Sequence, residues 1–336
     1  MLPALAVAEE LVRRGATVTF AGSPDRAEAR LVPEAGFELD TFRIAGLPRR
    51  PGVPLLRALL LAGAAPLACG QILARRRPDA VLGGGGYVAG PMVVAAWRRR
   101  IPAAVTEADA RLGLANRLAL PFARRIFLAY PPGRPLRAKE RVVGRPLPAR
   151  SRARPREEAR ALFGLPGESP VLGVFGALAG ASTLNELAVS AWGESGPAVL
   201  HLSGERDFAA IEGRVRRADY RLLAATECFG AALSAVDLAV SRAGGTVWEL
   251  AAAGVPSILV PYPYATSGHQ ALNAGHFEAG GGAVLVPEAR LGEVPALVES
   301  LLADPVRLAR MRQAMFALAR PEAAAEIAEE LIALAR

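Results

Sequence analysis

The stretch 238–260 constrains the fold more than any other, because it places a strand, a glycine turn, a helix and a second strand in close succession. An apolar run ends at Val240, two glycines break it, and a helical pattern begins at Thr246 and stops before Gly254. A second apolar run follows at 257–260. This order predicts a βαβ unit of a parallel sheet. The N-terminus of its helix would offer free N–H groups and partial positive charge to the phosphates of a nucleotide.

Glu249 lies in the first turn of this predicted helix, and the residues allow two interpretations of it. Its carboxylate could accept two hydrogen bonds from a ribose diol. Alternatively, Thr246 and Glu249 have the spacing of a capping box, which is common at helix starts. The residues alone leave both interpretations open.

Strand and helix patterns alternate along most of the chain, and one segment interrupts them. Residues 145–155 are rich in proline and arginine and poor in apolar residues, as expected of a hinge between domains. The alternation restarts after it, and 336 residues suffice for two domains with separate cores. We therefore predict an α/β protein with two doubly wound parallel sheets. The domains would span 1–146 and 147–320, with a last helix at 321–336 returning to the first.

The composition favours a globular protein that meets anionic partners. Apolar residues make up 52% of the chain, which excludes disorder. The net charge is +8, and all but one of the 40 basic residues are arginine. Nucleic acid is the weaker choice of partner, because aromatic residues are few and are not interleaved with the arginines. A GC-rich genome or a hot habitat would also raise the arginine content. Cys69 and Cys228 lack metal-ligand spacing and are expected to be reduced thiols.

The apolar stretch 58–69 is too short to span a bilayer and contains a proline. Arginines flank it on both sides: Arg49, Arg50 and Arg57 before it, and the run 75–77 after it. It could be a core helix, which the pattern alone favours, or a helix that rests on an anionic membrane surface.

Four motifs, in this order, resemble the MurG family, the glycosyltransferases that add N-acetylglucosamine to lipid I in peptidoglycan synthesis. They are GGYVAGP (85–91), LGLANR (112–117), VFGALAGASTLNE (174–186) and SRAGGTVWELAAAGVPSILVPYPYATSGHQALNA (241–274). The resemblance covers nearly the whole chain. It implies the GT-B fold, in which two Rossmann-like domains face a cleft.

The family pattern implies two sets of binding residues. For the donor, it implies diphosphate contacts from the 244–246 turn, ribose contacts from Glu249, sugar contacts from the helix after it, and uracil packing. For the acceptor, it implies contacts from the glycine loop that precedes Tyr87 and from the segment that begins at Glu107, after the next predicted strand. The donor set is Asp109, Leu178, Phe229, Gly244, Gly245, Thr246, Glu249, His269, Gln270 and Asn273, and the acceptor set is Gly85, Gly86, Tyr87, Glu107 and Asn116.

The chain departs from the family pattern at several positions. Leu178 replaces a serine of the donor loop, and Pro148 replaces an arginine, for which Arg145 or Arg150 could substitute. The run 106–109 replaces a segment that contains asparagine in the family. These departures put catalytic efficiency and donor identity in question.

Met1 aligns just after the family's first glycine loop, so the histidine proposed as the base would lie upstream. This leaves Asp109 as the candidate catalytic residue. We also expect a gap in the first sheet, and upstream codons that encode a strand ending in a glycine loop and histidine.

The resemblance implies an inverting N-acetylglucosaminyltransferase that uses UDP-N-acetylglucosamine and lipid I at the cytoplasmic face of the cell membrane, as a peripheral protein. Neither a metal nor another cofactor is expected, since helix dipoles and arginines can neutralise the leaving UDP. Two alternatives remain: a GT-B enzyme for another lipid or a natural product, and a non-catalytic protein that binds UDP-sugars.

Overall fold

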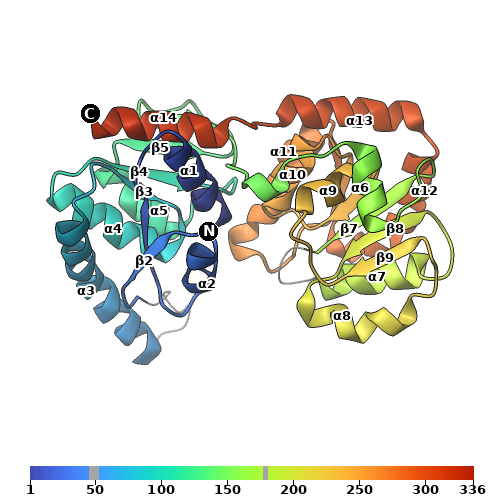
Figure 1. Cartoon of the computed structure of the whole chain (residues 1–336), viewed down its shortest axis with the longest axis horizontal. Coiled ribbons are helices and arrows are strands. Elements are labelled where there is room, and N and C mark those ends of the chain that lie inside the picture. Colours follow the sequence, from blue (N-terminus) through green and yellow to red (C-terminus); the bar gives the residue numbers. More distant parts are fainter. Residues whose placement is uncertain (45–52, 177–180) are drawn as a thin grey trace. The chain divides into compact units, whose positions relative to one another are not determined.

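The computed structural model describes residues 1–44, 53–176 and 181–336, and it gives only the backbone of residues 53–62. The chain divides into two compact units, which are Met1–Pro148 with Pro321–Arg336, and Ala149–Arg320. In each unit, parallel strands are covered by helices (Figure 1). Among the helices in the described ranges, none is both long enough and apolar enough to cross a bilayer.

The first unit alternates short strands with helices. Its elements are α1 (Leu2–Arg13), β1 (Thr19–Gly22), α2 (Ala27–Glu34), β2 (Glu38–Thr41), α3 (Val53–Arg76), β3 (Val81–Gly83), α4 (Gly86–Arg98), β4 (Ala103–Glu107), α5 (Leu114–Ala119), the 3-10 turn η1 (Leu120–Phe122), β5 (Arg125–Leu128), β6 (Glu140–Val142) and α14 (Ala323–Ala335). Its parallel strands form two groups, β1–β2 and β3–β4–β5–β6. No strand of the described ranges joins β1 to β3, in agreement with the gap predicted from the sequence.

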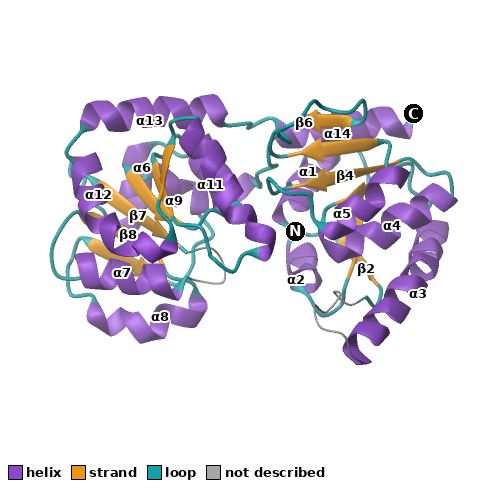
Figure 2. Ribbon diagram, turned by 180° about the vertical axis from the view of Figure 1, so that it is seen from behind, coloured by secondary structure: helices purple, strands orange, loops and turns teal. Residues whose placement is uncertain are grey.

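The four-stranded sheet of this unit is buried on both faces, because alternate residues of each strand point to opposite sides. Along β5, Ile126 and Leu128 pack with α3 and α4, whereas Phe127 packs with α1 and α14. Helix α14 therefore joins the first unit although it ends the chain, and it lies along α1 (Figure 2).

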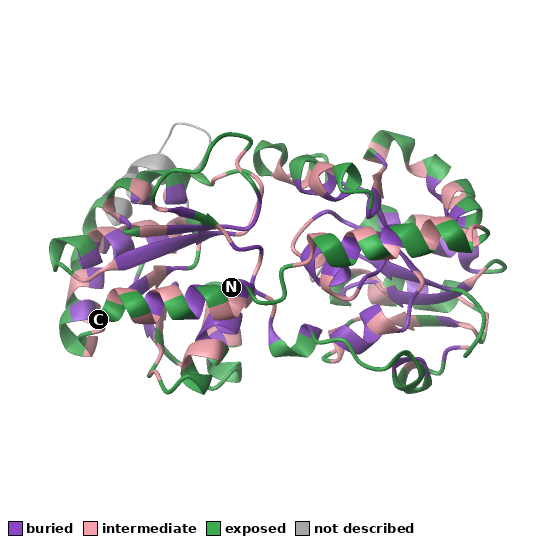
Figure 3. Ribbon diagram, turned by 90° about the horizontal axis from the view of Figure 1, so that it is seen from above, coloured by how far each residue is buried: buried purple, intermediate pink, exposed green. Residues whose placement is uncertain are grey.

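The second unit has a six-stranded parallel sheet. Its elements are η2 (Ala149–Ser151), α6 (Arg156–Phe163), β7 (Val171–Phe175), α7 (Ser182–Trp192), β8 (Ala198–Leu202), α8 (Glu205–Ile211), η3 (Glu212–Arg214), β9 (Tyr220–Leu223), α9 (Phe229–Ser234), β10 (Leu238–Ser241), α10 (Thr246–Ala252), β11 (Ser257–Leu259), η4 (Thr266–Gly268), α11 (His269–Ala279), β12 (Ala283–Leu285), η5 (Glu288–Glu293), α12 (Val294–Leu302) and α13 (Pro305–Leu318). Figure 3 shows buried residues along the strands and on the inner sides of the helices.

The strand order of the second sheet is β12-β11-β10-β7-β8-β9, so the direction of winding reverses between β7 and β10. Ligands of doubly wound sheets bind beyond the carboxyl ends of the strands at such a reversal. Here those ends are Phe175 and Ser241, which are paired in register. The topology thus places a candidate site where the sequence predicted one.

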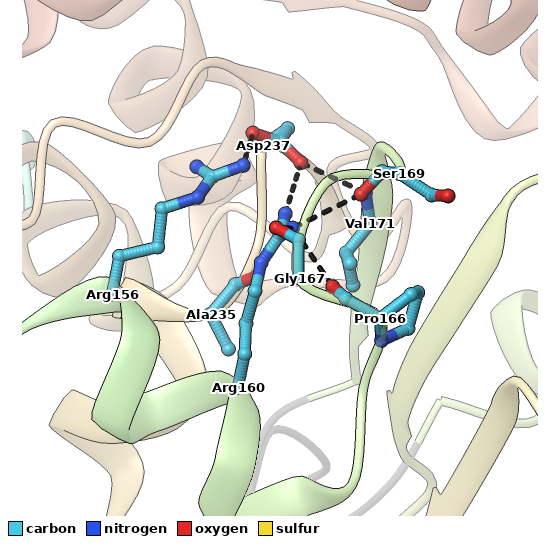
Figure 4. A network of polar contacts seen from close by, with 8 residues as sticks. All are labelled: Arg156, Arg160, Pro166, Gly167, Ser169, Val171, Ala235 and Asp237. Carbon is cyan, nitrogen blue, oxygen red and sulfur yellow. Dashed lines mark hydrogen bonds and ion pairs between the residues drawn. The ribbon is translucent and has the colours of Figure 1, made fainter.

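The amino ends of the same two strands are held by a buried arginine (Figure 4). Arg160 of α6 donates to Asp237 at 2.7 Å, and the same Asp237 oxygen accepts the backbone N–H of Val171 at 2.8 Å. Arg156 reaches the other oxygen of Asp237 from a more exposed position. The Arg160 guanidinium also donates to four backbone carbonyls, those of Pro166, Gly167, Ser169 and Ala235.

The first unit differs from the sequence pattern in two details. The pattern after the glycine loop predicts a helix from Pro91, whereas helix α4 begins at Gly86, because Gly85 and Gly86 take positive φ values (89° and 68°) that turn the chain into the helix early. Pro91 is accommodated inside the helix. The sequence pattern did not predict the short strands β5 and β6, since β5 has only three successive apolar residues and β6 has a single one.

Candidate functional site

The turn after β10 forms the centre of the candidate donor site. The hydroxyl of Ser241 donates to the carbonyl of Phe175 at 3.0 Å and ties the ends of β10 and β7 together. Helix α10 then starts at Thr246, with Gly245 as its N-cap residue and no side-chain hydrogen bond at the cap. The capping-box interpretation of Thr246 and Glu249 is therefore wrong. Glu249 is buried and instead accepts a hydrogen bond of 2.5 Å from Ser151.

Helix α11 brings two amide side chains to this turn. Asn273 is buried and donates to the carbonyl of Ala243 at 3.1 Å. Gln270, one turn earlier, has its amide nitrogen 4.0 Å from the position a Cβ would take on Gly244. Its oxygen accepts the backbone N–H of Tyr262 at 2.8 Å. Gln270 and Asn273 therefore lie beside the glycine turn.

Of three other predicted donor residues, the structure shows contacts for Phe229 and His269 and does not describe Leu178. Phe229 is the first residue of α9 and packs edge-to-face on Phe175, with ring centroids 5.7 Å apart. His269 makes a local contact, since its Nδ1 lies 2.8 Å from the carbonyl oxygen of Thr266. Leu178 lies outside the described residues.

Sequence reasoning missed Arg242, which organises the same edge of the sheet. Its guanidinium is buried and bonds to Glu288 and to Thr183, the latter at 2.7 Å. Arg242 holds the pKa of Glu288 below its usual range, chiefly through this hydrogen bond. The ion pair with Glu288 links the end of β10 to η5, and the hydrogen bond to Thr183 links it to the start of α7. The available signal was an arginine directly after a buried strand.

The acceptor residues predicted in the first unit lie at the carboxyl ends of β3 and β4. Gly85 and Gly86 form the turn into α4, and the positive φ values explain why glycine is needed there. Tyr87 follows them, and the guanidinium of Arg26 stacks over its ring at 5.9 Å.

Glu107 at the end of β4 and Asn116 on α5 come together, although they are nine positions apart in the sequence. One oxygen of Glu107 accepts from the Asn116 amide at 2.9 Å and from the N–H of Gly113 at 2.8 Å. The other accepts the N–H of Asp109 at 3.3 Å. Arg145 donates to the neighbouring carbonyl of Ala108 at 3.3 Å. The carboxylate of Glu107 thus fixes the loop that carries Asp109.

Comparison with known proteins identifies both units. The glycosyltransferase family 28 N-terminal domain matches residues 1–128, and the family's C-terminal domain matches residues 171–330. A protein from Alkalilimnicola ehrlichii is 40% identical over 100% of this chain and 96% of its own, and one from Rubrobacter xylanophilus is 38% identical over 98% and 99%. Both are named UDP-N-acetylglucosamine–N-acetylmuramyl-(pentapeptide) pyrophosphoryl-undecaprenol N-acetylglucosamine transferase.

Solved structures agree with these relatives. The structure of MurG from Acinetobacter baumannii has a TM-score of 0.80 and 28% identity, covering 98% of this chain and 95% of its own. The calicheamicin glycosyltransferase CalG4 has a TM-score of 0.69 at 18% identity, covering 99% of this chain and 94% of its own, and shares the fold.

The two parallel-sheet units, with a site at the winding reversal of the second, define a glycosyltransferase of the GT-B class. Within that class, the chain belongs to glycosyltransferase family 28 and to its MurG family.

Proposed function

We propose that this protein transfers N-acetylglucosamine from UDP-N-acetylglucosamine to lipid I, the undecaprenyl-pyrophosphoryl-MurNAc-pentapeptide, and so makes lipid II. The observation that carries the proposal is that Gln270 and Asn273 of α11 converge on the turn at 243–245, while Glu249 is buried in the first turn of α10, the helix that follows it. These residues come from two helices and meet at the winding reversal of the sheet. Because the chain belongs to the MurG family, we interpret this convergence as a binding site for UDP-N-acetylglucosamine.

In the proposed donor complex, each group has a chemistry suited to one part of UDP-N-acetylglucosamine. The N–H groups of Gly244, Gly245 and Thr246 would bind the diphosphate. Glu249 would accept hydrogen bonds from the ribose hydroxyls, because a carboxylate is an acceptor only. Gln270 and Asn273 would contact the sugar, and Phe229 would pack near the uracil.

The proposed reaction is a single displacement at the anomeric carbon. The acceptor hydroxyl of lipid I forms the new C–O bond while the bond to UDP breaks, so the configuration inverts. A base must take the proton of the attacking hydroxyl. Asp109 is our candidate, because Glu107 holds its backbone at the end of β4. The leaving diphosphate would be stabilised by fixed N–H donors.

The acceptor is a membrane lipid, and the first unit has a surface suited to a membrane. Trp97, Leu114 and Leu118 are exposed by 54%, 58% and 63%, and the Trp97 ring packs in a tilted arrangement against Phe122, with ring centroids 5.0 Å apart. These four residues, called the apolar cluster below, lie on α4, α5 and η1, which pack against one another. Exposed arginines adjoin it in the sequence: Arg98, Arg99, Arg100, Arg117 and Arg124. We propose that the cluster rests on the cytoplasmic face of the membrane, where anionic lipid attracts the arginines.

The α3 segment was the sequence-based candidate for this contact. Arg49 and Arg50, which precede α3 in the sequence, lie outside the described residues, and the side chain of Arg57 is not described. Leu67, farther along α3, is 68% exposed and remains consistent with a membrane contact.

The decisive experiment measures transfer of radiolabelled N-acetylglucosamine to a lipid I analogue. Product formation with lipid I, and none with an unrelated polyprenyl sugar, is the expected result. Transfer only to another acceptor would support a different GT-B enzyme. UDP binding without any transfer would support a non-catalytic binding protein.

A further inference from the structure

Residues 151–154 form a strap across the second unit, and this strap contacts both helices that we assign to nucleoside binding. The side chain of Ser151 reaches Glu249 on α10. The backbone N–H of Arg154 donates to the hydroxyl of Ser234 on α9 at 3.0 Å. Helix α9 begins at Phe229, the residue that we place near the uracil.

The strap approaches α9 so closely that only glycine fits at one position. A Cβ on Gly230 would lie 1.8 Å from the carbonyl oxygen of Arg152, which is far inside van der Waals contact. The strap is therefore held in one place by the backbone of α9. This fixes the position from which the Ser151 hydroxyl reaches α10.

Both partners of the Ser151–Glu249 hydrogen bond are buried, with exposures of 5% and 8%. A glutamate side chain has several rotatable bonds, and a hydrogen bond to one carboxylate oxygen restricts them. Restricting a binding group before the ligand arrives lowers the entropy that is lost on binding. A carboxylate has about four acceptor positions, so a bond from Ser151 to one oxygen is compatible with recognition of a diol by the same carboxylate.

We propose that Ser151 is a positioning residue for ribose recognition: its hydroxyl orients the Glu249 carboxylate so that it accepts the two hydroxyls of the nucleotide ribose. The inference rests on the proposed function, since it deepens the assignment of Glu249. It predicts that Ser151 affects the affinity of the protein for a nucleotide only when that nucleotide carries the ribose diol.

The test compares calorimetric affinities for UDP and for its dideoxy analogue, which lacks both ribose hydroxyls. For the parent protein we expect UDP to bind about tenfold or more tightly than the analogue. Ser151→Ala should weaken UDP binding by about five- to tenfold and leave binding of the analogue nearly unchanged. Ser151→Thr, which keeps the hydroxyl, should retain most of the preference. In a Glu249→Ala background, Ser151→Ala should cause no further loss.

Ser257→Ala is the matched control, because Ser257 is a buried serine of the same unit whose hydroxyl bonds to the carbonyl of Val255. This control should leave the preference for UDP unchanged. An equal loss of affinity for UDP and for the dideoxy analogue in Ser151→Ala would overturn the proposal, since a change in packing alone would explain it. Tighter UDP binding would also overturn it, because Ser151 would then compete with the ribose.

The outcome separates this inference from the proposed function. If the parent protein does not bind UDP, the proposed function fails. If Glu249→Ala removes the preference for the diol and Ser151→Ala does not, only the role of Ser151 fails.

Discussion

The side-chain amide of Asn273 donates a hydrogen bond of 3.1 Å to the backbone carbonyl of Ala243, and both residues are buried. Since Ala243 precedes the glycine turn, this bond holds α11 beside the start of α10. It connects the stability of the unit to the geometry of the candidate donor site.

We expect Asn273→Ala to lower the free energy of unfolding by about 1–3 kcal/mol, because it leaves a buried carbonyl without this partner. Urea denaturation measures the change. Gln270→Ala is the companion variant: Gln270 is only half buried, so it should cost less stability while still weakening UDP-N-acetylglucosamine binding. An Asn273→Ala protein as stable as the parent would contradict the assigned role.

Glu249→Ala should weaken UDP binding by about 1–3 kcal/mol, because the ribose hydroxyls would lose their buried acceptor. Isothermal calorimetry gives the value directly. Thermal melting of the same variant shows whether the fold survives. Unchanged affinity in a folded variant would remove Glu249 from the donor site.

Arg160→Met should lower the free energy of unfolding by about 3–5 kcal/mol, because it leaves Asp237 and several backbone carbonyls without a buried cation. Arg156→Ala removes the partly exposed arginine on the same aspartate and should cost at most about 1 kcal/mol. Denaturant titration of both variants provides the comparison. Similar losses in the two variants would show that burial is not what makes Arg160 important.

His201 should make folding sensitive to mild acid. Its ring is buried between Tyr220 and Asn185, each at 2.9 Å, and burial lowers its pKa to about 4. The unfolded histidine has a pKa of about 6.5, so between these values the unfolded chain binds a proton that the folded chain does not. Stability is therefore expected to fall as pH decreases from about 6.5 to 4.

The expected loss from His201 is about 2 kcal/mol between pH 7 and pH 5. Urea denaturation at both pH values measures it. His201→Gln should reduce this loss, since glutamine does not titrate. The same pH dependence in parent and variant would assign the acid sensitivity to other groups.

The protein should adsorb reversibly to vesicles that contain anionic lipid, and adsorption should weaken as salt rises. Leu118→Ser should reduce adsorption without lowering stability, because Leu118 is 63% exposed. Co-sedimentation over a salt series tests both statements. Leu272→Ser, which changes an exposed leucine of the second unit, is the control and should have no effect. Equal binding to neutral and anionic vesicles would exclude the electrostatic part of the proposal.

The sequence by itself determined the α/β class, the family and the position of the glycine turn. These depend on local patterns. A buried parallel strand is a short apolar run, and few residues other than glycine can form such a turn. The helix predicted to begin at Thr246 and to stop before Gly254 is α10, which spans Thr246–Ala252. The family motifs also identified Gln270 and Asn273, whose spacing places them on one face of α11.

Only the tertiary structure decided what the polar side chains bond to. Thr246 and Glu249 match a capping box in sequence, yet Glu249 bonds to Ser151, which lies 98 positions away. Arg242 and Glu288 are separated by 46 positions, and Arg160 and Asp237 by 77. Such pairs form because parallel strands require long crossover connections that bring distant segments to one edge of the sheet. No local pattern encodes these partners, so they become visible only after the sheet has assembled.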